Sequence, residues 1–345
     1  MNGRSLYFVG PGEVECIPRP VPPLSPDAVR VETQYSAISA GTEGLLYRGE
    51  APARLETDGP VETLVEDLSY PVRYGYAAVG TVVETGEEVN DRWLDEQVFA
   101  YNPHETTFVA DPESLLVVPA AVSIRRAPLL ANAETAVNFL LDGQPALGER
   151  VAVFGQGVVG LLTTGLLAEL ALECLVVVDP IERRRELALE FGADVAVDPT
   201  SGDLTELFEQ HTPGRPDLTY ELSGNPAALD DAMSITGYDG RLVVGSWYGT
   251  KPAELRFGGR FHRHRLDIES SQVSTIAPRH EGRWSRDRRH QQAWNWLEAL
   301  PVERLITHEI PFEHAPDAYA LLEDEPAQAV QVLLTYEDDT GRRNL

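Results

Sequence analysis

The sequence is short of lysine, cysteine and long apolar runs. Its 345 residues include two cysteines, which exclude a disulfide scaffold and any zinc site built from several cysteines. No long apolar run opens the chain, so we expect no signal peptide and a cytoplasmic protein. Basic residues number 28 against 55 acidic ones, which gives a formal net charge of −27. Such a charge is repelled by nucleic acids and by anionic membranes, and we expect neither as a partner.

Among the basic residues, Lys251 is the single lysine and the rest are arginines. This acidic, lysine-poor composition resembles that of proteins from salt-loving archaea. At molar salt the Debye length is about 3 Å, so that dense like charges repel one another little. Excess carboxylates then keep the surface hydrated. The alternative is an ordinary acidic cytosolic protein, and we favour a halophilic one because lysine is so scarce.

A chain of this length with 43% apolar residues predicts two domains with sizeable cores. Short runs in which apolar and polar residues alternate, such as residues 28–33, predict that residues 1–125 are rich in β-strands. From residue 150 apolar strands alternate with helical segments, which indicates a parallel α/β sheet. The tail from about residue 275 returns to mixed structure and ends in a strand-like run at 330–334.

The α/β region opens with a strand, a glycine turn, a helix and a second strand. We predict the strands at Arg150–Phe154 and Cys174–Val178 and the helix over 158–172. Further strands are expected at 195–197, 218–221 and 242–244. The helix and second strand together have the length of a membrane span, but this stretch contains two glutamates, and a helix followed by a buried strand explains it better.

A glycine-rich motif fills the turn between strand and helix. Its residues are Gly155, Gln156, Gly157, Val158, Val159 and Gly160, in the pattern G-x-G-x-x-G. The first glycine permits the tight turn, the second lets the backbone approach a pyrophosphate, and the third lets the helix pack on the strand. The helix N-terminus offers N–H groups and a positive dipole end to the phosphates. The motif predicts a dinucleotide site, the alternative being a glycine turn without a ligand.

Asp179 ends the second strand, 19 residues after Gly160. At this spacing a carboxylate accepts hydrogen bonds from the adenosine ribose and repels a 2′-phosphate, so we expect NAD rather than NADP. Arg183, Arg184 and Arg185 follow it and would favour a 2′-phosphate. Their alternative roles are to pair with neighbouring glutamates or to stack on adenine.

With these features, the whole chain resembles the medium-chain dehydrogenase/reductase superfamily, of the zinc alcohol dehydrogenase type. Four segments resemble that family's G-I-C-G-T-D, G-H-E, G-D-R-V and strand-end S-G motifs, in this order: 36–43, 75–77, 95–98 and 221–224. The Ser-Ala-Gly-Thr-Glu segment at 39–43 and the Gly-Tyr pair at 75–76 are most like the bacteriochlorophyllide dehydrogenase branch.

This resemblance implies an α/β fold with two domains. A GroES-like β-rich catalytic domain would comprise residues 1–125 and 275–345, and a Rossmann domain with a doubly wound parallel sheet would comprise 126–274. It also implies an NAD-dependent oxidoreductase for an alcohol or carbonyl substrate, and a homodimer paired through the last strand of the cofactor sheet, near 265–273. The alternatives are a quinone- or enone-reductase-like enzyme, which would usually prefer NADPH, and a sensor that binds NAD without catalysis.

The chain departs from the family at the catalytic zinc. The cysteine position holds Ser39 or Ala40, the histidine position holds Tyr76, and the acid beside it is replaced by Ala77. The third ligand position falls at Ala131. None of these side chains is a usual zinc donor, so we predict no zinc. A rearranged metal site also remains open, with donors from Glu43, His104, Glu134 or His262.

Without zinc, hydrogen-bond donors would have to stabilise a developing alkoxide. By resemblance, Thr42 is the proton-relay hydroxyl, Tyr76 brings a phenol into the same pocket, and Ser39 is a partner for them. His104 is the single histidine of the first 200 residues and a candidate acid or base. The alternatives are a turn cap for Thr42, a strand aromatic for Tyr76 and a surface loop residue for His104.

Three further residues are predicted to contact the cofactor. Thr135 matches a residue that packs beside the nicotinamide in the family, with filling of a helix face as its alternative. By the same resemblance, Ser223 belongs to the strand-end S-G segment near the cofactor. Ser246 follows the carboxyl end of a predicted strand, where parallel sheets bind ligands.

Positive charge gathers in one window of the sequence. Residues 256–290 hold nine arginines and four acids, a local net charge of +5, together with four of the eight histidines. Two interpretations remain open. The window either forms an electropositive mouth for an anionic substrate or the cofactor pyrophosphate, or forms a salt-bridged surface that faces acidic neighbours.

Overall fold

The structure, a computed structural model, describes residues 2–55 and 67–336, and the chain divides into two compact units. The first unit comprises Met1–Ala131 with Leu305–Leu345, and the second comprises Asn132–Arg304. The second unit is longer than the domain expected over 126–274. It gains residues at its end because Arg289, beyond the last parallel strand, forms a buried ion pair with Glu134 of the same unit.

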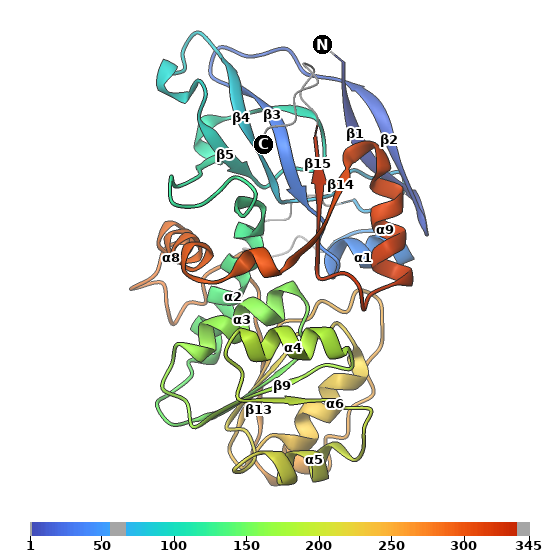
Figure 1. Ribbon diagram of the computed structural model, residues 1–345, viewed down its shortest axis with the longest axis vertical. Coiled ribbons are helices and arrows are strands. Elements are labelled where there is room, and N and C mark those ends of the chain that lie inside the picture. Colours follow the sequence, from blue (N-terminus) through green and yellow to red (C-terminus); the bar gives the residue numbers. More distant parts are fainter. Residues whose placement is uncertain (1, 56–66, 337–345) are drawn as a thin grey trace. The chain divides into compact units, whose positions relative to one another are not determined.

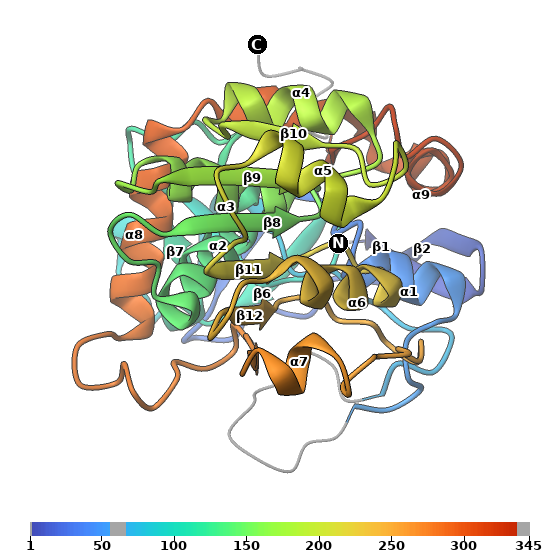
Figure 2. The same cartoon turned by 90° about the horizontal axis from the view of Figure 1, so that it is seen from below.

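The second unit is built on a six-stranded parallel sheet in the order β10-β9-β8-β11-β12-β13 (Figure 2). The strands are β8 (Arg150–Phe154), β9 (Cys174–Val178), β10 (Val195–Val197), β11 (Leu218–Glu221), β12 (Arg241–Val244) and β13 (Asp267–Ser270). The chain first extends the sheet from β8 to one side and then crosses to β11 on the other. The carboxyl end of β8 therefore lies at the topological switch point, where open sheets of this kind bind ligands. The predicted fold class is confirmed.

Helices connect these strands, and two more, α2 (Leu130–Gly143) and α8 (Arg286–Ala299), lie before and after them in the chain. The connecting helices are α3 (Val158–Ala168), α4 (Glu182–Glu190), α5 (Leu204–His211), α6 (Pro226–Ile235) and α7 (Arg260–Arg263). Helix α3 ends four residues before the predicted position, because the following backbone pairs with the loop before β8, through Ala171 with Gly148 and through Glu173 with Glu149. Across residues 2–55 and 67–336, no helix combines the length and apolar character needed to span a membrane.

The first unit is β-rich (Figure 1). Its strands are β1 (Asn2–Gly10), β2 (Glu13–Pro20), β3 (Val29–Ala37), β4 (Ala78–Thr85), β5 (Gln97–Ala100), β6 (Thr107–Ala110), β7 (Leu116–Val117), β14 (Ile306–Pro311) and β15 (Gln331–Thr335), and its helices are α1 (Thr42–Arg48) and α9 (Ala315–Asp324). A seven-stranded sheet has the order β14-β15-β3-β4-β5-β7, with β6 on β3, and β1 pairs with β2 separately. The chain's tail thus returns to this unit, where β15 lies antiparallel to β3.

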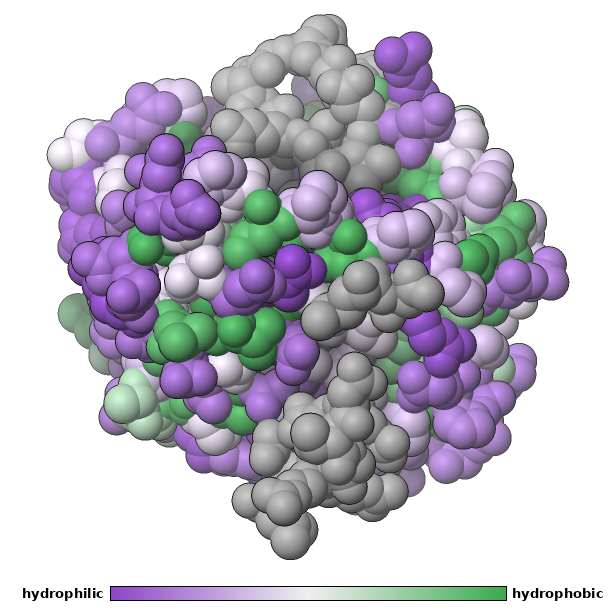
Figure 3. Space-filling view, turned by 90° about the horizontal axis from the view of Figure 1, so that it is seen from above, coloured by the Kyte–Doolittle hydropathy of each residue, from purple (hydrophilic) through white to green (hydrophobic). Residues whose placement is uncertain are grey.

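Apolar side chains fill the interior of each unit. In the first unit, Phe8 and Phe312 belong to a buried cluster under the β1–β2 pair and α9. In the second unit, Val176 and Phe208 belong to a cluster between the parallel sheet and its helices. The burial of these apolar surfaces is the main stabilising contribution to each unit. Figure 3 shows one face of the molecule, on which hydrophilic residues prevail and hydrophobic ones form separate patches.

Candidate functional site

The glycine turn joins the carboxyl end of β8 to α3. Gly155 has a φ of +87°, and a Cβ there would lie 2.5 Å from the Ser223 Cα. A Cβ at Gly160 would lie 1.9 Å from the Gly155 carbonyl oxygen. Both positions therefore require glycine. At Gly157 a Cβ would meet no atom within 4 Å, so this side of the turn is open to an approaching pyrophosphate.

Helix α3 begins beside this open position. Gly157 is its N-cap and provides no side-chain cap, and the Leu161 N–H donates to the Gly157 carbonyl at 2.9 Å. The N–H groups of the helical residues before Leu161 have no acceptor within the helix, which makes the terminus an anion site. Val158 is buried and Val159 half-buried, so a pyrophosphate at this terminus would meet their backbone N–H groups.

Gln156 requires a correction, because its side chain points away from the open side of the turn. It is fully buried, its Nε2 donates to the Val153 carbonyl at 3.3 Å, and its Oε1 accepts from the Thr164 hydroxyl at 3.0 Å. The Gln156 N–H donates to Asp179 at 2.7 Å. Gln156 therefore shapes the turn from inside, and its side chain makes no contact with a ligand on the open side.

Asp179 lies at the end of β9 and is almost fully buried. One carboxylate oxygen accepts the Gln156 N–H, and the other accepts the Ile181 N–H at 2.8 Å. Sequence reasoning assigned Asp179 to the ribose alone, whereas the structure shows that it also fixes the glycine turn. Each carboxylate oxygen has a second lone pair, so these bonds leave acceptor capacity for ribose hydroxyls.

The three arginines after Asp179 have different environments. Arg183 is exposed, whereas Arg184 is half-buried, and burial lowers the pKa of its guanidinium while the charge of Asp179 raises it. Arg185 donates to the Asp179 carbonyl at 2.7 Å and pairs with Asp198 at 3.2 Å. Arg185 therefore fixes the chain after β9, and Arg184 is the arginine whose charge is coupled to Asp179.

Polar residues also follow the carboxyl ends of β11 and β12. Glu221 is fully buried, and its carboxylate accepts hydrogen bonds from the Ser223 N–H at 2.9 Å and from the Ser223 and Tyr248 hydroxyls. The Ser246 hydroxyl accepts the Gly224 N–H at 2.9 Å. Ser223 and Ser246, both predicted contacts, therefore lie on adjacent strand ends at the edge of the sheet that carries the glycine turn.

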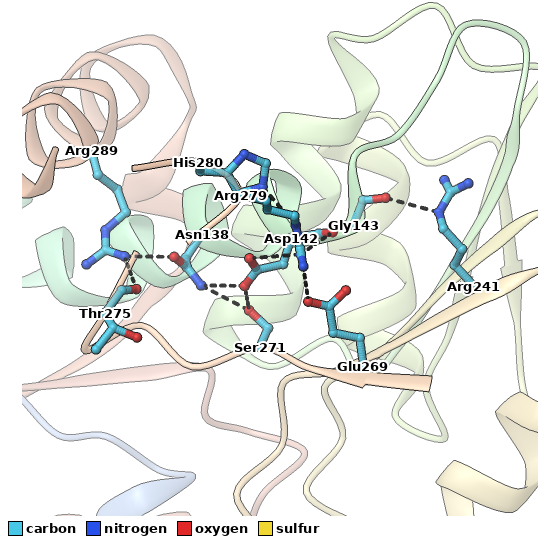
Figure 4. A network of polar contacts seen from close by, with 10 residues as sticks. All are labelled: Asn138, Asp142, Gly143, Arg241, Glu269, Ser271, Thr275, Arg279, His280 and Arg289. Carbon is cyan, nitrogen blue, oxygen red and sulfur yellow. Dashed lines mark hydrogen bonds and ion pairs between the residues drawn. The ribbon is translucent and has the colours of Figure 1, made fainter. Parts of the chain in front are cut away.

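Ion pairs hold four of the nine arginines in the window of residues 256–290. The pairs join Arg256 to Asp230, Arg265 to Asp239, Arg279 to Asp142 and Glu269, and Arg289 to Glu134. Figure 4 shows Arg289 directed at Asn138 and at the Thr275 carbonyl, and Arg279 between Asp142 and Glu269. Arg256, Arg265 and Arg279 therefore agree with a salt-bridged surface, whereas the pair of Arg289 with Glu134 is buried. The buried Arg289 also connects α8 to α2, the helix on which Thr135 is half-buried.

In the first unit, three hydroxyl groups gather near the start of α1. The Tyr76 hydroxyl donates to the Ser39 hydroxyl at 2.5 Å. Burial raises the pKa of Tyr76, and hydrogen bonds with Ser39 and Thr42 lower it only in part. All three residues are half-buried, so they remain reachable from the surface of this unit. The residues predicted as catalytic hydroxyls therefore form one group.

His104 belongs to a buried network behind this group. It is fully buried, which contradicts a surface loop position, and its Nε2 lies 3.0 Å from a Glu43 carboxylate oxygen. Its Nδ1 lies 2.7 Å from the Ser36 hydroxyl, which lies 2.7 Å from the Tyr336 hydroxyl. The other Glu43 oxygen accepts the Ser39 N–H at 2.8 Å. Because both ring nitrogens have protein partners, His104 holds Glu43, and through it Ser39, in position.

The donor set for zinc does not fit. Ser39 and Tyr76 bond to each other, and the alanines at the other family positions have no donor atom. Of the rearranged donors, Glu43 and His104 meet, whereas Glu134 pairs with Arg289 in the second unit and His262 is exposed on α7. Within the described parts of the chain, no three His, Cys, Asp or Glu side chains come together as a metal site.

Sequence reasoning missed several members of these networks. Tyr319 donates to Glu43, and Tyr336 contacts Ser36, although both tyrosines lie more than 270 positions along the chain from their partners. Burial and the charge of Glu43 raise the pKa of Tyr319 well above its usual value. No local pattern marks such residues. Glu221, by contrast, lies two residues before Ser223 at the end of β11, and an acid at the end of a buried strand was a usable signal.

Comparisons with known proteins agree with this geometry. Residues 159–287 match the family model described as zinc-binding dehydrogenase. D-guloside 3-dehydrogenase from Escherichia coli is 24% identical over 89% of this chain and 93% of its own. A bacteriochlorophyllide relative, 2-desacetyl-2-hydroxyethyl bacteriochlorophyllide A dehydrogenase from Cereibacter sphaeroides, is 27% identical over 88% of each chain. A crystal structure described as a short chain alcohol dehydrogenase from E. coli, complexed with NADH, has a TM-score of 0.79 at 23% identity and covers 97% of this chain and 99% of its own.

These similarities support an oxidoreductase of the zinc-binding dehydrogenase type and show that the fold is shared with alcohol dehydrogenases. They do not select a substrate, because the curated relatives act on different compounds by their names. The bacteriochlorophyllide branch and the homodimer therefore stay predictions.

Proposed function

We propose that this protein is a zinc-independent, NAD-dependent oxidoreductase that transfers hydride between NAD(H) and an alcohol or carbonyl group. The observation that carries the proposal is the glycine turn, where the uncapped N-terminus of α3 meets the open position at Gly157. Asp179 is bonded to the same turn. A dinucleotide pyrophosphate and its ribose need this combination of donors, space and a carboxylate.

The residues of the second unit would hold NAD as follows. The α3 N-terminus would bind the pyrophosphate, Asp179 the adenosine ribose, and Arg184 would lie near the adenosine end. Ser223, Ser246 and Thr135 would contact the rest of the cofactor. When bound, NAD supplies the acceptor or donor of the hydride. The remaining task, to bind the substrate oxygen and handle its proton, would fall to the first unit.

Tyr76, Ser39 and Thr42 have the chemistry for that task. Removal of hydride from an alcohol carbon requires donors that stabilise the negative charge on oxygen. Because burial raises the pKa of Tyr76, its phenol keeps its proton at neutral pH and donates a hydrogen bond. In the structure the Ser39 hydroxyl, 2.5 Å away, accepts this hydrogen bond. Glu43 and His104 would act as positioning residues, since Glu43 binds the backbone of Ser39.

Cofactor choice provides the first test, read as the ratio of NADH to NADPH affinity in a fluorescence titration. Wild-type protein should bind NADH at least about tenfold more tightly, since roughly 1.4 kcal/mol gives that factor. Asp179→Ser should reduce the ratio, and the ratio is the correct measure because loss of the turn contacts weakens both cofactors. Glu182→Gln, an exposed acid three positions away, is the matched control and should keep the ratio. Tighter binding of NADPH by the wild type would contradict the proposal.

Turnover provides the second test. With a panel of alcohols and NAD, Tyr76→Phe should lower kcat by at least about tenfold, within the range of a lost proton-transfer group, and leave NADH binding unchanged. Tyr35→Phe, a half-buried tyrosine on β3, is the control. Reduction of enones with NADPH would instead identify the reductase alternative. Tight NADH binding with no turnover of either substrate class would identify a sensor.

A further inference from the structure

An open cavity of about 430 Å³ lies on the second unit, at the edge of the sheet opposite the glycine turn. Its lining includes Arg150, Arg215, Asp217, Tyr238, Arg260 and His264. Arg150 begins β8, Asp217 immediately precedes β11, and His264 lies three residues before β13. The strands are parallel, so these are their amino ends. The strand β8, with five residues of about 3.3 Å each, separates the cavity from the turn.

The cavity concentrates positive charge in a chain whose net charge is −27. Three arginines and a histidine face a single carboxylate among its lining residues. The guanidinium of Arg150 is already held by Asp217, through two contacts of 3.3 Å. Arg215 and Arg260 are not neutralised in this way. Arg215 donates to the Ser234 carbonyl at 2.9 Å and reaches the exposed Glu209 only at 3.5 Å.

Arg260 is the least satisfied of these residues. Its Nη2 donates to the Thr236 carbonyl at 2.8 Å, while its buried Nε has no hydrogen-bond partner within residues 2–55 and 67–336. Burial lowers the pKa of Arg260, and the charge of Arg215 lowers it further. Burial and the charges of nearby arginines, with Arg260 and Arg215 foremost, also lower the pKa of His264. The charge contributions to both shifts have the sign expected where positive groups lie close together.

We infer that this cavity is a second ligand site, which binds a phosphate monoester with a flat organic part. Guanidinium groups match phosphate oxygens in geometry and charge, and Arg215 and Arg260 both line the cavity. Tyr238 is 69% exposed, and its ring meets the His264 ring edge-on at 6.3 Å between centroids. An exposed ring beside the arginines is a stacking surface for the rest of the ligand. The site is independent of the proposed dinucleotide site.

The test uses inorganic phosphate and phenyl phosphate as probes, in calorimetric titrations of the full chain at about 2 M potassium chloride, where long-range attraction is screened. Both probes should bind with one site per chain, and saturating NADH should leave this binding unchanged. Arg260→Gln should weaken both by at least about tenfold, because a charged hydrogen bond of roughly 1.5–3 kcal/mol is lost. Arg263→Gln, exposed on the same helix, should bind like the wild type.

Two further variants separate the two halves of the ligand. Tyr238→Ala should reduce the affinity for phenyl phosphate to that for phosphate and leave phosphate binding unchanged. Asp217→Asn should strengthen the binding of both probes, because it removes the carboxylate of the lining. Thermal melts confirm that each variant is folded. Displacement of phosphate by NADH, or equal binding by wild type and Arg260→Gln, would overturn the inference, because the ion would then occupy the glycine turn or no defined site.

Discussion

The Nε2 atom of His104 lies 3.0 Å from a carboxylate oxygen of Glu43, and neither side chain is exposed to solvent. The contact joins the loop before β6 to the first turn of α1. A Cβ at Gly75 would lie 2.8 Å from the His104 ring, so only glycine at this position lets the ring pack here. Glu43 in turn accepts the N–H of Ser39, whose hydroxyl bonds to Tyr76. The buried Glu43 and His104 therefore hold in place the backbone of Ser39, one of the three clustered hydroxyl residues.

Glu43→Gln should destabilise the first unit by about 1–3 kcal/mol, because an amide in place of the carboxylate faces donors and leaves buried groups unsatisfied. Urea unfolding measures the change. Glu113→Gln, an exposed acid of the same unit, is the control and should change stability by no more than about 0.5 kcal/mol. Equal stability of the two variants would show that the Glu43 network contributes nothing to folding.

Neither the folded protein nor its activity should require zinc. Purified protein should contain no stoichiometric zinc, and chelators should leave its activity unchanged, because Ser39, Tyr76 and Ala131, which the resemblance places at the ligand positions, are not usual zinc donors. Elemental analysis of the purified chain is the direct measurement. About one zinc per chain would require a donor set outside the positions considered above.

Folding should weaken as salt falls below molar concentrations. Repulsion among the excess carboxylates becomes long-ranged when the Debye length grows from about 3 Å at 1 M to about 10 Å at 0.1 M salt. Thermal melts between about 0.1 and 3 M potassium chloride should show a rising midpoint. A constant midpoint across this range would favour an ordinary acidic protein over a halophilic one.

Asp217 should make stability depend on pH. Burial raises the pKa of its carboxyl, but hydrogen bonds from the Arg150 backbone and side chain, together with the Arg150 charge, bring the pKa below its usual value. The folded state thus favours the ionised form, and this contribution is present above the unfolded pKa and lost as pH falls through the folded one.

Asp217→Asn should therefore cost at most about 1 kcal/mol at pH 7, because the pair is partly exposed. The difference from wild type should shrink as pH falls below about 4. Urea unfolding at both pH values measures it, with the exposed Glu281→Gln as control. A difference that is constant between the two pH values would show that the Asp217 charge is not its source.

The order strand, glycine turn, helix and strand was readable from the sequence, because apolar periodicity and glycine positions are local properties. The predicted strands at Arg150–Phe154 and Cys174–Val178 match β8 and β9 residue for residue. The spacing from Gly160 to Asp179 was readable for the same reason, since one βαβ unit has a fixed length. The end of α3 was not readable from the sequence, because it depends on backbone hydrogen bonds with the loop at Gly148.

The sequence by itself determined the parallel sheet and the glycine turn between β8 and α3, since each depends on residue types at short spacing. The tertiary structure alone decided that His104 is buried against Glu43, that Gln156 points inward and that Arg289 extends the second unit. It also separated the paired arginines of residues 256–290 from Arg260, which lines a cavity. Contacts between residues far apart in the chain decide burial and pairing, and no local pattern records them.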